Sequence, residues 1–191
     1  KPLRKEIPVF VAGVQPKMLQ VAGAIGQGAL STWHTVDNAR KAREYVDIGA
    51  REAGRDPKDV DLAQMIPCFV TEDGRTGRER MRYRAAFKIF MLPRYRDRMV
   101  EAGFADEVEK VRQLYLEGKI HEAASLVPDE LIEAFGIVGT PDEASAKIQA
   151  FRNVGVTLPM LSLRTPPGIE VSREEAKEQF MQSIRACAPA A

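Results

Sequence analysis

The sequence predicts an α/β fold with a parallel sheet, because short β-rich runs alternate with helical stretches along the whole chain. Four runs have strand character: residues 7–12, 29–32, 60–70 and 158–162. The first is almost entirely apolar and ends at Gly13, which is typical of a strand buried on both faces. Four strands fit either a small open sheet or part of a (β/α)8 barrel, which typically takes about 250 residues. The hydrophobic periodicity of the sequence does not decide between the open sheet and the barrel.

The first two helices are indicated by residues at their ends. Pro16 suits the first position of the first helix. Its apolar positions, at helical spacing, are Met18, Leu19, Ala22 and Ile25. Asp37 is expected to cap the second helix, which runs to about Ala53 and is followed by Gly54 in the left-handed position.

Capping signals also define the second half of the chain. A long helical, polar region is expected over residues 75–134, after a strand in which Pro67 predicts a bulge or an early end. Thr140 and Glu143 form one capping box, and Ser172 and Glu175 form another. The apolar positions after these boxes are Ala144, Ile148, Phe151 and Val154 in one helix, and Phe180 and Ile184 in the other.

Composition excludes several classes of protein. The chain has 191 residues and a formal net charge of +1, so the overall charge indicates no polyanionic partner. No run of about 20 apolar residues is present, and we expect no membrane span. Cys68 and Cys187 lie far apart in the sequence, which favours free thiols in a reducing cytoplasm over a disulfide framework or a metal site.

The turn from the first strand into the first helix is the main candidate site. Residues 13–16 read Gly-Val-Gln-Pro, so a glycine precedes a helix start, where N–H groups and a partial positive charge favour an anion. Lys17 opposes the helix dipole unless an anion lies nearby. Two interpretations stay open: a cradle for a cofactor phosphate, or a tight turn beside a solvated lysine.

Polar residues after the second strand are further candidates. Ser31 and Thr32 end that strand, and the carboxyl ends of barrel strands form the active face. Alternatively, their hydroxyls only satisfy backbone groups. His34 could contact substrate or donate a proton near neutral pH. Since it has no identified acid or base partner, a structural or solvated histidine is favoured.

A basic segment covers residues 75–98, which contain nine basic side chains, two acidic ones and four interleaved aromatics. Such a segment is compatible with single-stranded nucleic acid, or with attraction of an acidic ligand. Its apolar residues at helical spacing are Met81, Ala85, Ile89 and Leu92. We therefore favour a packed helix with a solvated basic side.

Two segments carry a resemblance to a known family. Residues 7–32 read IPVFVAGVQPKMLQVAGAIGQGALST, which resembles a signature of luciferase-like monooxygenases in the branch that uses coenzyme F420. Residues 138–161 contain VGTPDE, IQAF, GVT and PML, which are similar to the family's closing unit, and EAGRDP at 52–57 is a weaker match. These segments follow the family's order and resemble the fifth to eighth strands of its (β/α)8 barrel. The resemblance implies the C-terminal half of a TIM barrel, a single partial domain over 1–191 with a helical insertion at about 75–134.

The resemblance also implies an activity. It is a hydride transfer between deazaflavin coenzyme F420 and an organic substrate, with FMN and a monooxygenase activity as the alternative. The cofactor phosphate is expected at Ala12, Gly13, Val14, Gln15, Lys17, Ser31 and Thr32. In the family, much of the ring pocket comes from early strands that have no counterpart here. Beyond His34 as a candidate, no catalytic residue is assigned.

The resemblance bears on partners as well. A half barrel leaves two sheet edges unpaired, so we expect this chain to pair with the missing N-terminal half or with a second copy of itself. The rival from another class is a non-catalytic half barrel that binds or assembles. One departure is Gly26-Gln27-Gly28, where the family usually has Ala-Asp-Gly, which puts the hydrogen bonds of that loop in doubt.

Overall fold

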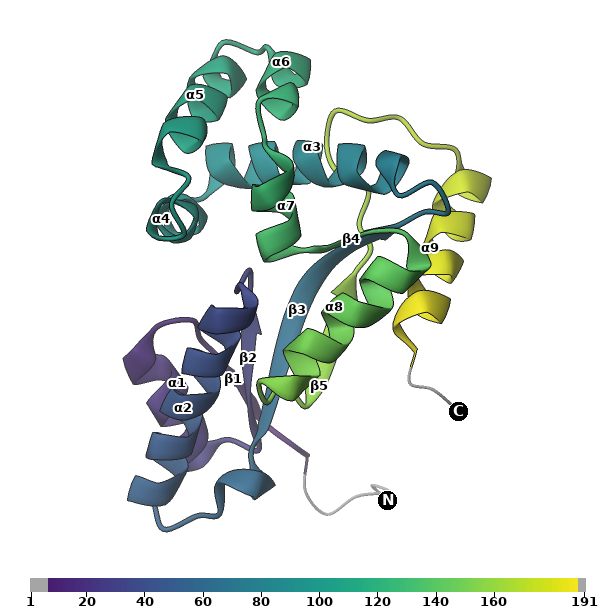
Figure 1. The fold of residues 1–191 in the computed structure, drawn as a ribbon. Coiled ribbons are helices and arrows are strands. Elements are labelled where there is room, and N and C mark those ends of the chain that lie inside the picture. Colours follow the sequence, from purple (N-terminus) through teal and green to yellow (C-terminus); the bar gives the residue numbers. More distant parts are fainter. Residues whose placement is uncertain (1–6, 189–191) are drawn as a thin grey trace. The chain divides into compact units, whose positions relative to one another are not determined.

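The computed structural model describes residues 7–188, and the chain divides into two compact units (Figure 1). Unit 1 comprises residues up to 66 together with 149–160, and unit 2 comprises 67–148 together with 161 onward. The elements that begin in unit 1 are β1 (Phe10–Ala12), α1 (Pro16–Ile25), β2 (Gly28–Thr32), α2 (Val36–Glu52), the short 3-10 helix η1 (Pro57–Asp59), β3 (Asp61–Val70) and β5 (Leu158–Ser162). Those that begin in unit 2 are α3 (Arg75–Met91), α4 (Pro93–Glu101), α5 (Ala105–Leu116), α6 (Ile120–Ser125), α7 (Asp129–Phe135), β4 (Ile137–Gly139), α8 (Pro141–Asn153) and α9 (Arg173–Cys187).

The sheet of unit 1 is parallel, as the sequence predicts. β1 pairs with β2 and β2 pairs with β3, so that Val11 lies opposite Ala29 and Ala29 opposite Leu62. Paired residues of neighbouring parallel strands share one face of a sheet. The face that carries Ala29 and Leu62 is buried, whereas Ala12 and Met65, on the opposite face, are exposed.

Two glycines let α1 and α2 approach each other closely. A Cβ atom on Gly23 would lie 2.0 Å from the carbonyl oxygen of Val46 in α2. A Cβ atom on Gly49 would lie 1.9 Å from the carbonyl oxygen of Gln20 in α1. Each glycine thus receives the backbone of the other helix, and any larger side chain would force the helices apart.

The first strand is shorter and more exposed than the sequence predicts. It covers only Phe10–Ala12, and Ile7 and Val9 are 83% and 59% exposed. β1 is an edge strand. Among the described strands it pairs with β2 on one side, and no strand pairs with its other side. The prediction of a strand buried on both faces is therefore wrong. The predicted face of α1 is half right, since Leu19 and Ala22 are buried and Met18 and Ile25 are exposed.

The N-terminal end of α2 differs from the prediction, whereas its C-terminal end agrees with it. Thr35, rather than Asp37, is the N-cap, and its Oγ1 accepts a hydrogen bond from the Asn38 N–H at 3.1 Å. Asp37 instead lies in the first turn, where its carboxylate complements the helix dipole and pairs with Arg40 at 2.8 Å. At the other end, Gly54 adopts φ +72°, which confirms the left-handed position.

In unit 2, β3 continues past Pro67 and gains a new partner. The ladder with β2 stops at Met65, and a parallel ladder with β4 begins at Cys68. Pro67 lies between the two ladders, where its missing donor costs least, so the predicted bulge or early end is wrong. β4 has only three residues, too few for a recognisable alternation, and the sequence analysis missed it. The expected helical region forms α3 to α7, which pack around α3.

The two capping boxes form to different degrees. In α8, the Thr140 N–H donates to the Glu143 carboxylate at 2.7 Å and the Glu143 N–H donates to Thr140 Oγ1 at 3.4 Å, which confirms the box. In α9, Ser172 Oγ accepts from the Glu175 N–H at 3.2 Å, but the Glu175 carboxylate binds Arg80 instead of returning to the cap. The helix runs through Phe180 and Ile184 as predicted, and its buried residues are Gln179, Ser183 and Cys187.

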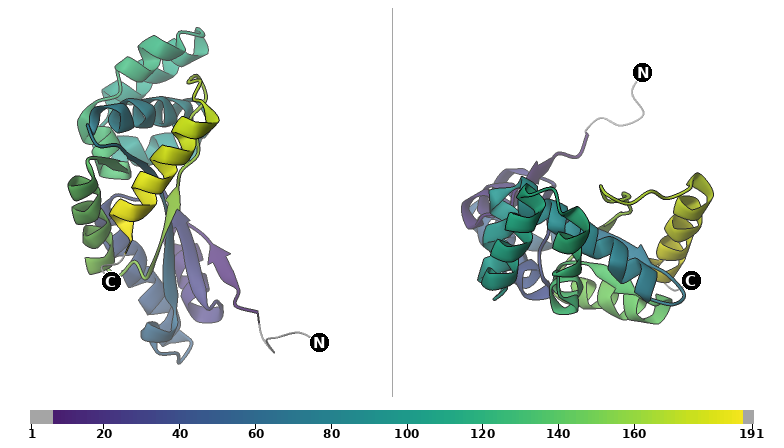
Figure 2. Two further views of the ribbon diagram at one scale, coloured as in Figure 1. Left: turned by 90° about the vertical axis from the view of Figure 1, so that its right-hand side faces the viewer. Right: turned by 90° about the horizontal axis from the view of Figure 1, so that it is seen from above.

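The contact of β3 with α9 brings the two cysteines together. Figures 1 and 2 show α9, in yellow, beside the carboxyl end of β3. The Val70 N–H donates to Ser183 Oγ at 3.2 Å, so Cys68, two residues earlier, faces Cys187, one helical turn later. Both cysteines are buried thiols that form no disulfide within the described residues, in agreement with the sequence analysis. The hydrogen bond between the Cys68 and Cys187 side chains, together with burial, raises the pKa of Cys68 well above its ordinary value.

Candidate functional site

The turn between β1 and α1, in unit 1, is open to solvent on its outer side. The Gly13 N–H donates to the Leu30 carbonyl at 3.0 Å, so this amide extends the ladder with β2 and does not face an anion. A Cβ on Gly13 would lie 2.8 Å from the Cβ of Met18, so glycine is required for the close return of the helix. Val14 is half-buried, and Gln15 and Lys17 are exposed.

The start of α1 is chemically suited to a negative charge. The side chain of the N-cap residue Gln15 accepts no hydrogen bond from the first turn of α1. The first turn also contains no acidic residue. Pro16 has no N–H, so the outward donors of the first turn are the backbone groups of Lys17 and Met18. Lys17 adds a cation that the helix dipole disfavours, a local cost that a bound anion would offset.

The two hydroxyls after β2 have different surroundings. Ser31 is 1% exposed, and its Oγ lies 3.5 Å from the Ala63 carbonyl. Thr32 is half-buried, and its Oγ1 donates to the Met65 carbonyl at 3.1 Å. Both hydroxyls therefore donate to backbone carbonyls within the neighbouring strand β3, which agrees with a structural role more than with the predicted ligand contact. Thr32 is the better placed for a ligand, because rotation of its exposed hydroxyl would redirect the donor.

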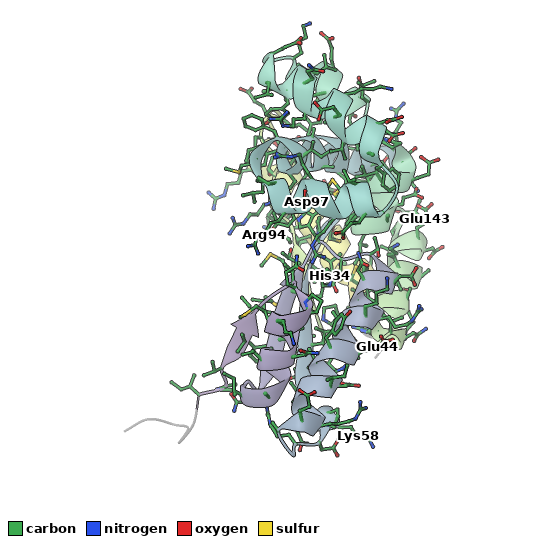
Figure 3. All side chains as sticks on the ribbon, turned by 90° about the vertical axis from the view of Figure 1, so that its left-hand side faces the viewer. His34, Glu44, Lys58, Arg94, Asp97 and Glu143 are labelled. Carbon is green, nitrogen blue, oxygen red and sulfur yellow. The ribbon has the colours of Figure 1, made fainter. Side chains whose placement is uncertain are left out.

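Trp33 and His34 form a tight corner that follows β2. Trp33 has φ +53°, which is unfavourable for a bulky side chain, and both residues are buried. The His34 carbonyl accepts a hydrogen bond from Gln64 Nε2 at 3.2 Å, and Gln64 is fully buried in β3. Figure 3 shows His34 at the end of unit 1 opposite to Lys58. Burial excludes a solvated His34, and the corner is a strained backbone of the kind that gathers at functional sites.

The sequence analysis missed Gln64, although it carried a signal, and named Gln27 only as a departure from the family pattern. Gln64 is a polar residue inside an otherwise apolar strand run. Its Oε1 is buried and has no hydrogen-bond partner among the described residues. The Gln27 side chain accepts from the Val9 N–H at 2.8 Å, while its own N–H donates to the Val9 carbonyl at 3.0 Å. The loop that departs from the family pattern thus anchors the chain that enters β1.

The basic segment of unit 2 is mainly structural. Arg78 binds Glu133 and Glu143 at 3.1 and 2.8 Å, and the pKa of Arg78 is raised chiefly by Glu143. Arg80, which is 6% exposed, and Arg82 bind carboxylates on α9 and α7 at 2.7 and 2.6 Å. These arginines face other elements of unit 2 and do not form the solvated basic side that the sequence predicts. The predicted apolar face is confirmed at Met81, Ala85 and Ile89, whereas Leu92 is exposed.

Comparison with known proteins identifies the family. Residues 1–158 match the family model of the luciferase-like monooxygenases. This chain belongs to the luciferase-like monooxygenase family. The resemblance found in the sequence is therefore confirmed, and the parallel sheet with its helices is the α/β fold of this family.

The proteins similar to this luciferase-like chain include oxidoreductases, some of whose descriptions name coenzyme F420. A 5,10-methylenetetrahydromethanopterin reductase from Methanolobus tindarius is 28% identical over 158 residues, which is 80% of this chain and 47% of that protein. A putative coenzyme F420-dependent oxidoreductase from Mycobacterium tuberculosis is 25% identical and matches 82% of this chain and 47% of its own length. The structure of the coenzyme F420-dependent tetrahydromethanopterin reductase from Methanopyrus kandleri matches with a TM-score of 0.77 and 27% identity, over 93% of this chain and 50% of that one.

The luciferase-like chain spans about half the length of the curated relatives it matches. The same share holds for the matched structures, including an F420-dependent secondary alcohol dehydrogenase with a TM-score of 0.66 and 21% identity, which supports the fold. No helix in residues 7–188 is both long and apolar enough to span a bilayer.

Proposed function

We propose that this chain is the C-terminal, phosphate-binding half of an oxidoreductase that transfers a hydride between deazaflavin coenzyme F420 and an organic substrate in the cytoplasm. The observation that carries the proposal is the uncapped start of α1, with Lys17 in its first turn and no acid there. Support comes from relatives of this family whose descriptions name coenzyme F420 as their cofactor.

The residues of the turn fit a phosphate group. The N–H groups of Lys17 and Met18 and the ammonium of Lys17 would bind phosphate oxygens, and Thr32 would add a hydroxyl from the end of β2. When bound, the deazaflavin supplies the hydride chemistry itself. The chain positions it: the hydrogen bond of Gln64 to the His34 carbonyl fixes the corner after β2, and the buried side chains of Trp33 and His34 exclude water there.

A charge series at Lys17 tests the phosphate site. Lys17→Gln should weaken the binding of coenzyme F420 about tenfold, because a hydrogen bond to a charged group contributes about 1.5 kcal/mol. Lys17→Glu should weaken it further. The control is Lys58→Gln, an exposed lysine at the opposite end of unit 1, which should leave affinity unchanged (Figure 3). Affinity is measured by fluorescence titration of the deazaflavin.

Substitution of Gly13 separates charge from shape. Gly13→Ala and Gly13→Asp both place a Cβ against Met18, but only aspartate adds a negative charge beside the start of α1. We expect Gly13→Asp to lose binding well beyond Gly13→Ala. Equal affinities of Lys17→Glu, Gly13→Asp and the unmodified chain would refute the phosphate site, and tighter binding of FMN than of coenzyme F420 would refute the choice of cofactor.

We further propose that the missing N-terminal half of the barrel covers the exposed sheet face of unit 1. Large apolar side chains on described strands are exposed there: Met65 at 38%, and Leu158 and Met160 at 43% each. The matched relatives are about twice as long, so a complementary half is chemically reasonable. Size-exclusion chromatography with light scattering on the chain, alone and mixed with the N-terminal half of a relative, tests this. A stable monomer that does not bind the added N-terminal half would contradict this proposal. A homodimer would indicate that a second copy of this chain covers the sheet face instead.

A further inference from the structure

Three cationic side chains gather at the carboxyl end of β5 in unit 2: Arg84 and Lys88 on α3, and Arg164 on the segment that follows β5. Arg84 Nη2 donates to Ser162 Oγ at 2.8 Å, and its Nη1 donates to the Arg164 carbonyl at 3.2 Å. Lys88 lies one turn beyond Arg84, and its Nζ is 4.8 Å from the ring centroid of Tyr95. Figure 1 shows the segment after β5 passing along α3, as these two hydrogen bonds require.

No carboxylate balances this cationic cluster among the described contacts. The other buried or half-buried arginines of α3 behave differently, since Arg78, Arg80 and Arg82 each bind an acidic side chain. The partners of Arg84 are a hydroxyl and a carbonyl, both neutral. Burial, and next the charge of Arg164, lower the pKa of Arg84. Burial and the charges of Arg84 and Arg164 lower the pKa of Lys88.

Such an arrangement costs folding free energy unless an anion joins it. Arg84 and Lys88 are half-buried, and like charges that are partly removed from water repel one another more strongly than charges on the surface, whereas Arg164 is exposed. Arg84 Nε is also buried without an acceptor among the described residues, so one of its donors remains unsatisfied. A carboxylate or phosphate offers several acceptor oxygens and a negative charge, and guanidinium groups bind such planar or tetrahedral anions well.

The position of the cluster points to a substrate. The carboxyl ends of barrel strands carry the active sites of this fold, and Ser162 is the last residue of β5. We infer that Arg84, Lys88 and Arg164 bind the carboxylate or phosphate of an anionic organic substrate. This inference rests on the proposed function for the reaction but names a substrate class that the cofactor site does not determine.

The test uses local signals from unit 2, so that it does not depend on the phosphate site of unit 1. Arginine Nε–Hε resonances of the ¹⁵N-labelled chain are followed while inorganic phosphate or glutarate is added at constant ionic strength. We expect saturable shifts at Arg84 and Arg164, and none at Arg94, an exposed arginine on α4 outside the cluster (Figure 3). Lys88→Gln and Arg164→Gln should each weaken the apparent affinity about tenfold, whereas Arg94→Gln should not.

Three outcomes would overturn the inference. Equal shifts at Arg94 and Arg164 would indicate nonspecific attraction of the anion to the positive charges of the chain. Unchanged affinity for the anion in Arg164→Gln would show that the cluster does not bind it. Shifts that appear with coenzyme F420 but with neither small anion would assign the cluster to the cofactor instead. Because the titration with small anions needs no deazaflavin, failure of the cofactor titration on Lys17 variants leaves its result intact. Arg84→Lys, which keeps the charge, serves as a check that the contact with Ser162 and the fold are retained.

Discussion

Replacement of Gly49 by alanine tests the close contact between α1 and α2. Alanine would place its Cβ 1.9 Å from the Gln20 carbonyl oxygen, whereas ordinary van der Waals contact begins at 3.4 Å. The helices must therefore part by about 1.5 Å, or α2 must shift by as much. The obstacle is a backbone oxygen, which cannot rotate aside as a flexible side chain could. The separation would also loosen the packing of Ala22 and Val46, which are fully buried.

The size of the effect follows from two opposing terms. Overpacking of a close contact costs about 1–3 kcal/mol, and a backbone obstacle favours the upper end. Alanine in the middle of a helix is intrinsically better than glycine by about 1 kcal/mol. The net expectation for Gly49→Ala is a loss of about 2 kcal/mol, which for a chain of this length lowers the melting temperature by about 4–8 °C. The control is Glu44→Ala, an exposed mid-helix change on α2 that should stay within about 0.5 kcal/mol (Figure 3).

Thermal and urea unfolding monitored by circular dichroism provide the measurement. A second check uses Gly23→Ala, whose Cβ would lie 2.0 Å from the Val46 carbonyl oxygen. Both substitutions part the same two helices, so the double variant should lose less than the sum of the two single losses. A raised melting temperature in Gly49→Ala, the result for an unobstructed helix position, would refute the close contact.

Three further outcomes are expected. Thr35→Ala should lower the free energy of unfolding by about 1 kcal/mol in urea titrations through loss of the N-cap, whereas Asp37→Ala should cost less. The Arg78 guanidinium lowers the pKa of Glu143, so the stability from this carboxylate is present above its ordinary pKa and is lost as pH falls through the lower folded value. Glu143→Gln should accordingly flatten the decline in stability below about pH 5, and an unchanged slope would contradict the ion pair. The raised pKa and burial of Cys68 predict slow alkylation at pH 8 that becomes rapid in denaturant; equal rates in both conditions would count against the buried thiol.

Local signals in the sequence were sufficient for much of the fold. Pro16 and the Thr140–Glu143 box define helix starts, and Gly54 defines a helix end, because each acts through its own backbone or that of residues three to five positions away. The alternation of strands and helices likewise predicted the parallel sheet. The exposure of β1 could not be read from its apolar residues, since burial of a strand depends on what lies beside it.

The cationic side chains of α3 show why the site was harder to predict than the fold. In the sequence, Arg78, Arg80, Arg82 and Arg84 are equivalent members of one basic run. Their carboxylate or hydroxyl partners lie 47 to 95 residues away, so spacing within the helix carries no information about which arginine is neutralised. Only the fold separates three arginines that hold unit 2 together from one that lacks an acid.

The same reasoning decides where binding energy would be found in this chain. An ion pair such as that of Arg82 with Asp129 is already satisfied, and an incoming anion would have to displace a carboxylate to use it. Lys17 and the cluster of Arg84, Lys88 and Arg164 have no such competitor among the contacts described, so an anion gains their charge at little cost. If charge-reversal at Arg82 weakened the binding of phosphate or coenzyme F420 as strongly as changes at Lys17 or Arg164, affinity would follow the total charge of the chain. Unequal losses, greatest where no acid is paired, are what the structure predicts.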